Sequence, residues 1–484
     1  MNLNLKYLYI VIFMALGSVA EASEPTPTQA LAGVSGYGET GACIQDPGAQ
    51  AGVYVYAGTD VPYEAPWQHI VLPDSLTPMH VVYVGRHGAR FMTSRKTVSS
   101  LSAYLKENGP LTQVGKRVLA LAAAVDSVTD GRWGALVPQE GRAELEGIGS
   151  RMSQTYAKLL KAGAKVKGEA SYVPRCVQSM DMLTYGMVWE CDSLQLDCAS
   201  GTQFSPLLRP FDSNRQYLDF KDAGEWKRVL EEYADTVAPA ATALRLTERG
   251  SRLIEMLCAE ALARGTSNSG ASLEVELDSM LSGPWRQQWV EIAGIDKHKA
   301  VSLAQDLYKL VSGCQAIGTG PGGLPWTVES DWRPYFTTME YYKLWSIVNL
   351  RHYLTYSASG LSRAPALMAA PLLGQLADDL DSAARGEASC AANVYLGHAE
   401  TLMPLMALMQ LPRAYYLTSD WGSVALHWLD WNIVPMGSNL QFVLCRAADS
   451  GNLYLLTYLC EQPVGKPQPW QEVLTQWRER IAAR

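Results

Sequence analysis

The 484-residue sequence lacks the features that mark zinc proteins, nucleic-acid-binding proteins and repeat proteins. It has only seven histidines, which do not cluster with its nine cysteines, and it has no Cys-x-x-Cys pair, so the spacing of a zinc site is missing. Asp and Glu (48) outnumber Lys and Arg (40), which argues against a basic face for nucleic acid. There are no internal repeats or low-complexity tracts. We therefore expect a globular protein with no metal, no cofactor and no nucleic-acid partner, in which an anionic ligand meets a local basic pocket.

Long apolar runs are also scarce, and the run at Tyr7–Leu16 is too short to span a membrane. A weakly positive start precedes it, and Ala20–Ala22 has the small residues of a signal-peptidase site. No cysteine follows closely, which argues against lipid attachment. We predict a signal peptide over residues 1–22, a mature start at Ser23, and export to a bacterial periplasm, with the outer surface or the extracellular medium as alternatives. No membrane contact is expected after cleavage; an uncleaved anchor is the competing interpretation.

The nine cysteines suit an oxidising compartment, so we predict intramolecular disulfides. Cys191 with Cys198, which closes a short loop, and Cys258 with Cys314, on two predicted helices, are the favoured pairs. The odd count leaves at least one thiol free. Cys176 is the candidate, because it lies on a predicted helix beside Arg175.

A basic loop follows the first predicted strand. Val81–Val84 has the β-branched and aromatic residues of a buried strand, and Gly85 ends it. Arg86–Arg90 (Arg-His-Gly-Ala-Arg) then places two guanidinium groups beside His87. Such groups repel each other unless an anion lies between them, and arginine suits phosphate or carboxylate oxygens. His87 is then a candidate nucleophile; the alternative is an exposed basic loop with a chance histidine.

The order of predicted elements indicates an α/β fold. A helix over 140–160 precedes a short strand at 170–173 and a helix over 176–188, and a second clear strand at 392–396 precedes another helix. This alternation predicts a central, mainly parallel sheet flanked by helices. Strands 440–445 and 453–459 are predicted to form a hairpin at the sheet edge.

The middle of the chain is mainly helical. Helical periodicity covers 226–237, 241–263, 275–281 and 301–317, and a Gly/Pro loop ends the segment. We predict an inserted all-α cap domain at 205–335, over a core formed by 23–204 and 336–484.

A second polar site follows the strand at 392–396. His398 and Glu400 lie where a helix N-terminus favours bound anions, so His398 is a candidate phosphate ligand. Bound phosphate raises the pKa of a nearby carboxyl, which makes Glu400 a candidate general acid. The alternative is a helix cap. Arg175, just past another strand, is either a third ligand or an exposed arginine.

These motifs together resemble the histidine acid phosphatase branch of the histidine phosphatases. Arg86–Arg90 with Thr93 is similar to the family's Arg-His-Gly-x-Arg-x-Pro-Thr signature, with Met92 in place of the proline. Residues 175–179 resemble its mid-chain arginine segment. The triplet 398–400 (His-Ala-Glu) resembles that of multiple inositol-polyphosphate phosphatases. The resemblance spans about residues 75–460 and includes flanking segments at Asn349–Tyr353, Leu402–Leu405, Val434–Met436 and Asn439.

The resemblance implies an exported phosphatase that hydrolyses inositol polyphosphates such as phytate through a phosphohistidine. His87 would be the nucleophile and Glu400 the acid. The phosphoryl group would be bound by Arg86, Arg90, Thr93, Arg175 and His398. A broad acid phosphatase, a sugar phosphatase and a non-catalytic phosphoester-binding protein are the alternatives.

Overall fold

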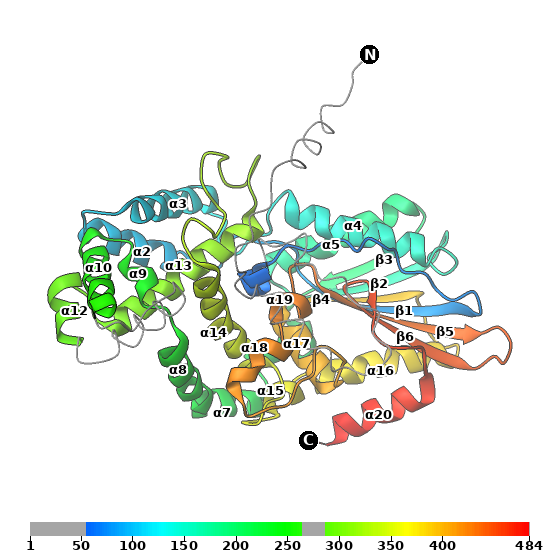
Figure 1. Cartoon of the computed structure of the whole chain (residues 1–484). Helices are drawn as coiled ribbons and strands as arrows, with labels where there is room; N and C mark the ends of the chain where they lie inside the picture. Colours follow the sequence, from blue (N-terminus) through cyan, green and yellow to red (C-terminus); the bar gives the residue numbers. More distant parts are fainter. Residues whose placement is uncertain (1–54, 264–285, 484) are drawn as a thin grey trace, which may run out of the picture. The chain divides into compact units, whose positions relative to one another are not determined.

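The computed structural model describes residues 55–263 and 286–483. Its strands form one sheet of order β3-β2-β4-β1-β5-β6-β7, and β8 pairs with β6 (Figure 1). The parallel strands are β1 (Leu76–Arg86), β2 (Lys165–Ala170), β3 (Gln195–Ser200) and β4 (Ala392–Gly397). The antiparallel strands are β5 (Asn439–Ala447), β6 (Leu453–Leu459), β7 (Gln462–Pro463) and β8 (Gln468–Pro469). The predicted hairpin is the β5–β6 pair.

Helices cover both faces of the sheet, because its central strands are apolar on both sides. Val81 and Tyr83 of β1 pack on one face, and Val82 and Val84 pack on the other. Figure 1 shows two helices above the sheet, α4 (Glu140–Thr155) and α5 (Pro174–Glu190). Below it lie α16 (Ala370–Ala384), α17 (Ala399–Leu408) and α20 (Trp470–Ala482). The predicted fold class is confirmed.

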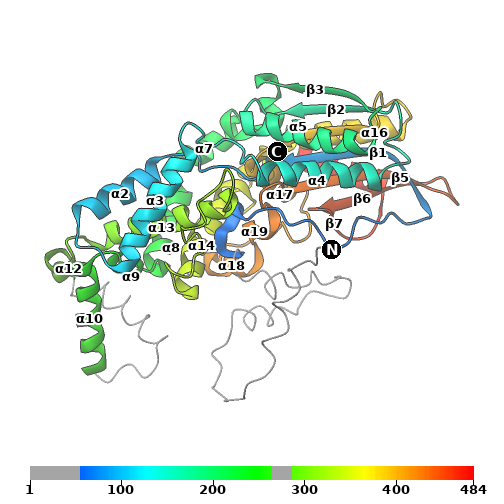
Figure 2. The same ribbon diagram turned by 90° about the horizontal axis from the view of Figure 1, so that it is seen from above.

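A second group of helices shares its own apolar core, seen beside the sheet in Figure 2. This group contains α2 (Lys96–Glu107), α3 (Gln113–Thr129), α8 (Glu225–Val237), α9 (Ala241–Leu244), α10 (Glu248–Ala263), α12 (Arg286–Ala293), α13 (Lys297–Ile317) and α14 (Thr338–Tyr356). Two of its helices, α2 and α3, come from before residue 205, so the helical core draws on more of the chain than the predicted cap. The boundaries of that cap stay predictions, and the predicted helix 275–281 lies outside the described residues.

Shorter helices complete the connections. They are η3 (Val55–Asp60), η4 (Thr202–Phe204), α6 (Ser205–Leu208), η5 (Pro210–Asp212), α7 (Arg215–Ala223), α15 (Ala364–Leu367), η6 (Trp421–Ser423), α18 (Val424–His427) and α19 (Asp430–Ile433).

The predicted disulfides are wrong for the cysteines that the structure describes, since all eight are free thiols. Cys314 lies inside α13, where its thiol donates to the carbonyl oxygen of Leu310 (3.1 Å). Cys198 lies on β3, a strand that was not predicted, so the segment after Cys191 is not a simple loop. Cys43 and the predicted signal peptide lie outside the described residues. No helix of the described part is both long and apolar enough to cross a membrane.

Candidate active site

Three predicted motifs meet where parallel strands end side by side. Arg86 of β1 pairs with Gly397 of β4, and β4 in turn pairs with β2 up to Ala170. The residues just beyond these ends therefore share one edge of the sheet, where open α/β folds bind ligands. The rings of His87 and His398 lie 5.6 Å apart, centroid to centroid, at 74°.

His87 is buried in an orientation that leaves one ring nitrogen free. Its Nδ1 lies 2.9 Å from the carbonyl oxygen of Gly88. Because a carbonyl oxygen only accepts hydrogen bonds, Nδ1 carries the proton and the neutral ring keeps its lone pair on Nε2. Burial, followed by the charges of Arg86 and Arg175, lowers the pKa of His87 well below 6.5. The ring is therefore neutral at pH 7 and able to act as a nucleophile.

The loop that carries His87 is fixed by hydrogen bonds and by close packing. The Gly88 amide donates to Ser179 Oγ (3.1 Å), and a Cβ at Gly88 would come within 2.4 Å of the Gly141 carbonyl oxygen. The Glu144 carboxylate accepts from the amides of Ala89 (2.6 Å) and Tyr63 (2.8 Å). Burial raises the pKa of Glu144 to about 7.

The two arginines of the signature are held by residues 59–60. Arg86 is 2% exposed, and its Nη1 donates to the carbonyl oxygens of Thr59 (2.5 Å) and Val434 (2.6 Å). Burial, and then repulsion from Arg90, lowers the pKa of Arg86 to about 10. Arg90 contacts Asp60 through Nη2 and Oδ1 at 3.4 Å. The positive charges of both guanidinium groups lower the pKa of His87.

His398 lies between two further arginines. Arg175 Nη2 is 3.4 Å from its Nδ1, and Arg209 Nη1 is 3.0 Å from its Nε2. Guanidinium groups only donate hydrogen bonds, and a neutral imidazole accepts at only one of its two nitrogens. At the other nitrogen, an arginine N–H therefore faces the N–H of the imidazole. Burial and the arginines lower the pKa of His398 to about 3, although Glu400 opposes the shift. An anion that accepts from both arginines would relieve this conflict.

Glu400 lies in the first turn of α17 and is ionised in this arrangement. Burial alone would raise its pKa, but its own backbone amide and the positive charge around it, including that of Arg86, lower it to about 2. To act as an acid it must therefore gain a proton when a phosphate group arrives, since a nearby anion raises a carboxyl pKa.

Thr93 is the last of the predicted site residues, and Cys176, the predicted free thiol, lies close to the site. Thr93 is exposed beside Gly134, where a Cβ would lie 3.7 Å from Thr93 Cα and 3.6 Å from Arg175 Nη1. Cys176 is free and buried, as predicted, with its Sγ 3.6 Å from His398 Nε2. Burial raises the pKa of its thiol to about 12, so the thiol is inert at neutral pH.

Sequence analysis missed Arg209, Asp60 and Glu144, and also Ser171, whose Oγ lies 3.1 Å from His398 Nε2. Arg209 pairs with Asp212 (2.6 Å) and lies 4.8 Å from the centroid of the Phe211 ring. Its signal was weak, because one arginine within short helical segments has no pattern of its own. Asp60 lies at the end of η3, before the first predicted strand, and belongs to no motif of the sequence.

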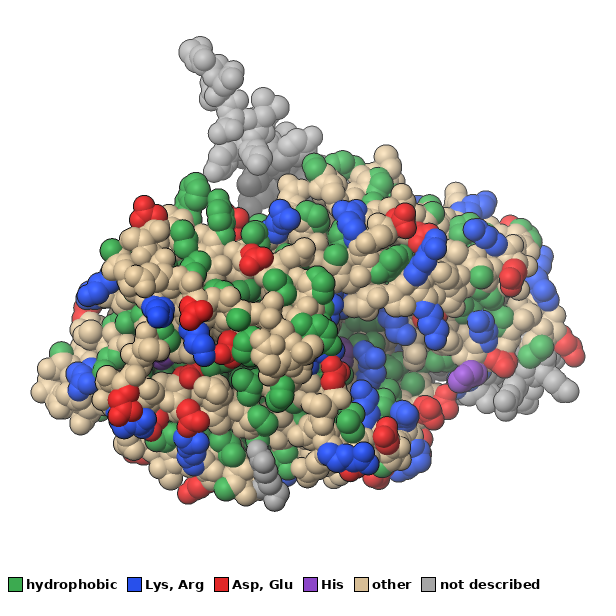
Figure 3. All heavy atoms as spheres, turned by 180° about the vertical axis from the view of Figure 1, so that it is seen from behind, with side chains coloured by type: hydrophobic (Ala, Val, Ile, Leu, Met, Phe, Trp, Pro, Cys, Tyr) green, Lys and Arg blue, Asp and Glu red, His purple; other side chains and the backbone are tan. Residues whose placement is uncertain are grey.

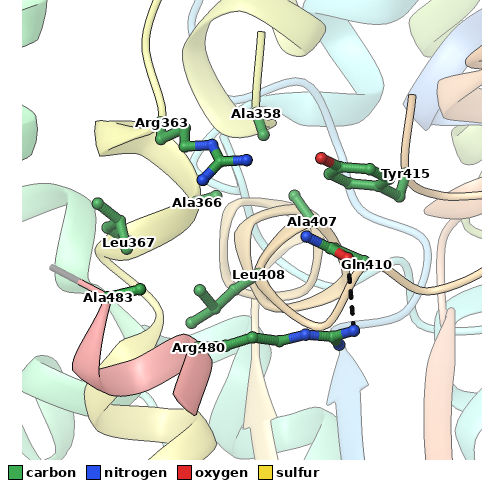
Figure 4. Close-up of a pocket in the computed structure, with 10 residues that line it drawn as sticks. All are labelled: Ala358, Arg363, Ala366, Leu367, Ala407, Leu408, Gln410, Tyr415, Arg480 and Ala483. Atoms are coloured by element: carbon green, nitrogen blue, oxygen red, sulfur yellow. Dashed lines mark hydrogen bonds between the residues drawn. The ribbon is translucent and has the colours of Figure 1, made fainter. Parts of the chain in front are cut away.

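One pocket of the described residues lies apart from this site. The pocket in Figure 4 has none of the predicted site residues in its lining, which consists of Ala358, Arg363, Ala366, Leu367, Ala407, Leu408, Gln410, Tyr415, Arg480 and Ala483. No group of three or more His, Cys, Asp or Glu side chains arranged to hold a metal ion occurs in the described part. The face in Figure 3 has a hollow bordered by Lys and Arg side chains.

Solved structures with the same fold include two kinds of phosphatase. One is a multiple inositol polyphosphate phosphatase of Bifidobacterium longum in complex with inositol hexasulfate (TM-score 0.62, 16% identity, covering 85% of this chain and 92% of that chain). Another is the phytase from D. castellii (TM-score 0.59, 14% identity, 88% and 85%). No curated protein matches this chain.

The family model described as "Histidine phosphatase superfamily (branch 2)" matches residues 79–460, a range that contains all seven predicted site residues. The chain therefore belongs to branch 2 of the histidine phosphatase superfamily.

Proposed function

We propose that this phosphatase hydrolyses inositol polyphosphates such as phytate through a phosphohistidine on His87. The observation that carries the proposal is the orientation of His87, which keeps Nε2 free and neutral at pH 7 among arginines.

The residues divide the reaction between them. His87 Nε2 attacks phosphorus, the N–P bond forms, and the bond to the ester oxygen breaks. Arg86, Arg90 and Arg175 donate to the equatorial oxygens, with Thr93, His398 and the additional Arg209 beside them. Phosphoryl transfer needs mainly such positioning and positive charge.

Glu400 accepts and donates the proton of the reaction. It takes up a proton as the phosphate group approaches and gives it to the leaving oxygen. Its carboxylate then accepts a proton from water, which attacks phosphorus and breaks the N–P bond. Inorganic phosphate and a protonated Glu400 result, so the cycle balances.

The substrate class rests on the resemblance of the His-Ala-Glu triplet. A broad acid phosphatase, a sugar phosphatase and a phosphoester-binding protein remain the alternatives. Phosphate release from phytate, a hexose phosphate and 4-nitrophenyl phosphate separates them. We expect the highest kcat/KM with phytate; a preference for either monoester would favour an alternative, and no turnover at all would favour binding alone.

Export remains part of the proposal. A signal peptide over residues 1–22 would leave a chain that starts at Ser23 in the periplasm. Intact-mass measurement of the protein recovered from a periplasmic fraction tests this, because an uncleaved chain would retain the mass of Met1–Ala22.

A further inference from the structure

One peptide group connects His87 to a carboxylate on α4. The carbonyl oxygen of Gly88 lies 2.9 Å from His87 Nδ1, and the amide of the same peptide group, that of Ala89, donates to Glu144 Oε2 (2.6 Å). The Nδ1 proton of His87, the peptide group and the Glu144 carboxylate therefore form one continuous line of hydrogen bonds. Hydrogen bonds that follow one another in this way polarise and strengthen each other.

Close packing against α4 fixes the orientation of this peptide group. A Cβ at Gly88 would lie 2.9 Å from Glu144 Oε2, and a Cβ at Gly141 would lie 2.3 Å from the carbonyl oxygen of Ala89. Glycine at both positions therefore allows the loop to approach the first turns of the helix. The carbonyl oxygen of Ala89 also accepts from the Val137 amide (2.8 Å). Rotation of the peptide group away from Glu144 would disturb these contacts.

The carboxylate of Glu144 is also held at its other oxygen. Oε1 accepts from the Tyr63 amide (2.8 Å), and the Tyr63 hydroxyl donates to Glu461 Oε2 (2.6 Å). Glu461 in turn accepts from Nε and Nη2 of Arg151 at 2.9 and 2.7 Å. Each oxygen of Glu144 thus accepts from a backbone amide, so the position of the carboxylate is set before a substrate binds.

Formation of a phosphohistidine adds positive charge to the His87 ring. Nε2 uses its lone pair for the N–P bond while Nδ1 keeps its proton, so the neutral imidazole gains one positive charge. The electron pair of the broken ester bond leaves with the oxygen, which takes its proton from Glu400. The positive charges of Arg86, Arg175 and Arg90, which lower the pKa of His87, oppose this change. A negative charge on the Nδ1 side of the ring would offset that repulsion.

We propose that Glu144 is a positioning residue for the nucleophile. Through the Gly88–Ala89 peptide group it keeps the His87 proton on Nδ1, and it stabilises the positive charge that the ring gains as the N–P bond forms. No proton moves along this line of hydrogen bonds, because the carboxylate acts through the oriented dipole of the peptide group. The inference rests on the proposed function, since it requires His87 to be the residue that is phosphorylated.

The test separates the charge of Glu144 from its shape. Glu144→Gln keeps the length of the side chain and removes the charge, whereas Glu144→Asp keeps the charge and shortens the side chain. Release of nitrophenol from 4-nitrophenyl phosphate in a single turnover, with enzyme in excess, measures formation of the phosphoenzyme alone. At pH 8, above the Glu144 pKa of about 7, the rate constant should fall about tenfold in Glu144→Gln and less in Glu144→Asp. Glu146→Gln, which removes an exposed carboxylate from the same helix, should keep the wild-type rate constant.

Inhibition by inorganic phosphate distinguishes this role from a general loosening of the loop. In the proposed function phosphate binds to the arginines without charging His87, so its inhibition constant should not rise in Glu144→Gln. Partial unfolding of a variant does not obscure the result, because the single-turnover rate constant at saturating enzyme describes only the folded molecules.

The failure of this inference differs from the failure of the proposed function. If wild type forms no phosphohistidine at His87, the proposed function is wrong. If wild type forms it, three results would each overturn the role of Glu144 and leave the proposed function standing. They are a rate constant in Glu144→Gln equal to that of wild type, a faster reaction in Glu144→Gln than in Glu144→Asp, and equal losses of rate and of phosphate binding.

Discussion

Three buried histidines of this protein differ in what fixes their protons. A carbonyl oxygen holds the Nδ1 proton of His87, and a carboxylate holds that of His352. His398 instead faces guanidinium groups at both nitrogens. The first arrangement leaves a free lone pair on Nε2, the second positions an arginine, and the third calls for an anion. The chemistry of each ring follows from its neighbours.

Glu400→Gln should separate two kinds of substrate. The amide keeps the size of the side chain but has no proton to give, and general acid catalysis is typically worth about 10²–10⁴-fold. Turnover of phytate, whose alkoxide needs a proton, should fall by that order. Turnover of 4-nitrophenyl phosphate should fall much less, because nitrophenolate leaves without a proton. The measurement is the steady-state rate on each substrate, under conditions in which cleavage of the ester bond limits the rate. Equal losses of rate on the two substrates would show that Glu400 is not the leaving-group acid.

His398 should make the folded state sensitive to acid. Its pKa is lowered to about 3 in the folded chain, against 6.5 as usual, so below pH 6.5 the unfolded chain binds a proton that the folded chain does not. This contribution to stability is complete above pH 6.5 and is lost as the pH falls toward 3. Between pH 7 and pH 5 the loss is about 2 kcal/mol.

Urea unfolding at both pH values measures this loss. In His398→Asn the difference between pH 7 and pH 5 should shrink by about 2 kcal/mol. His69→Asn, which replaces an exposed histidine, is the matched control and should keep the wild-type difference. An identical pH dependence in wild type and His398→Asn would contradict the burial argument.

At the scale of elements, α4 and α5 approach each other through glycines. A Cβ at Gly149 would come within 1.9 Å of the Leu183 carbonyl oxygen, and a Cβ at Gly186 within 2.0 Å of that of Glu146. Backbone atoms of this kind cannot move aside. The close contact matters because α5 begins with Pro174 and Arg175 and so positions the third arginine.

Gly149→Ala should therefore destabilise the protein by about 1–3 kcal/mol, the usual cost of overpacking. Gly147→Ala in the same helix is the control. Its Cβ would meet no backbone atom and would lie 3.0 Å from Nη1 of Arg151, whose Nε and Nη2 bind Glu461, and alanine favours the helix by roughly 0.5–1 kcal/mol. The midpoint of thermal unfolding should fall in Gly149→Ala and rise in Gly147→Ala. Equal shifts of the midpoint in the two variants would disprove the backbone contact.

The elements differ in how well the sequence predicts them. Val81–Val84 is apolar throughout, Ala392–Leu396 is apolar except for Asn393, and both lie in central strands. Strand β3 was missed because all six of its residues are exposed, so the sequence has no buried face to detect. Helix α3 begins at Gln113, because Thr112 Oγ1 accepts from the Gly115 amide and caps it.

For the whole molecule, distance along the chain limits prediction of the site. Arg86, Arg175 and His398 follow strand ends, and the sheet rule brings strand ends together. Arg209 and Asp60 reach the same place from segments without a strand, through tertiary packing that no local pattern encodes. The predicted disulfides were wrong for a related reason, since cysteine spacing does not reveal which thiols the fold brings together.

Catalysis should not depend on an added metal ion. Arg86, Arg90, Arg175 and Arg209 supply the positive charge that a divalent ion would otherwise provide to the phosphoryl oxygens. Phosphatase activity of the full-length enzyme should be the same after treatment with a strong chelator as before it. Activity that is lost on chelation and restored by one divalent ion would refute this.

The central claim is that His87 carries the phosphoryl group. Rapid quenching during turnover of radiolabelled phytate, followed by peptide mapping at alkaline pH, measures it most directly. The account predicts an acid-labile, base-stable label on the peptide that contains His87, and neither label nor turnover in His87→Ala. A label on a different residue, or turnover that persists in His87→Ala, would contradict the account.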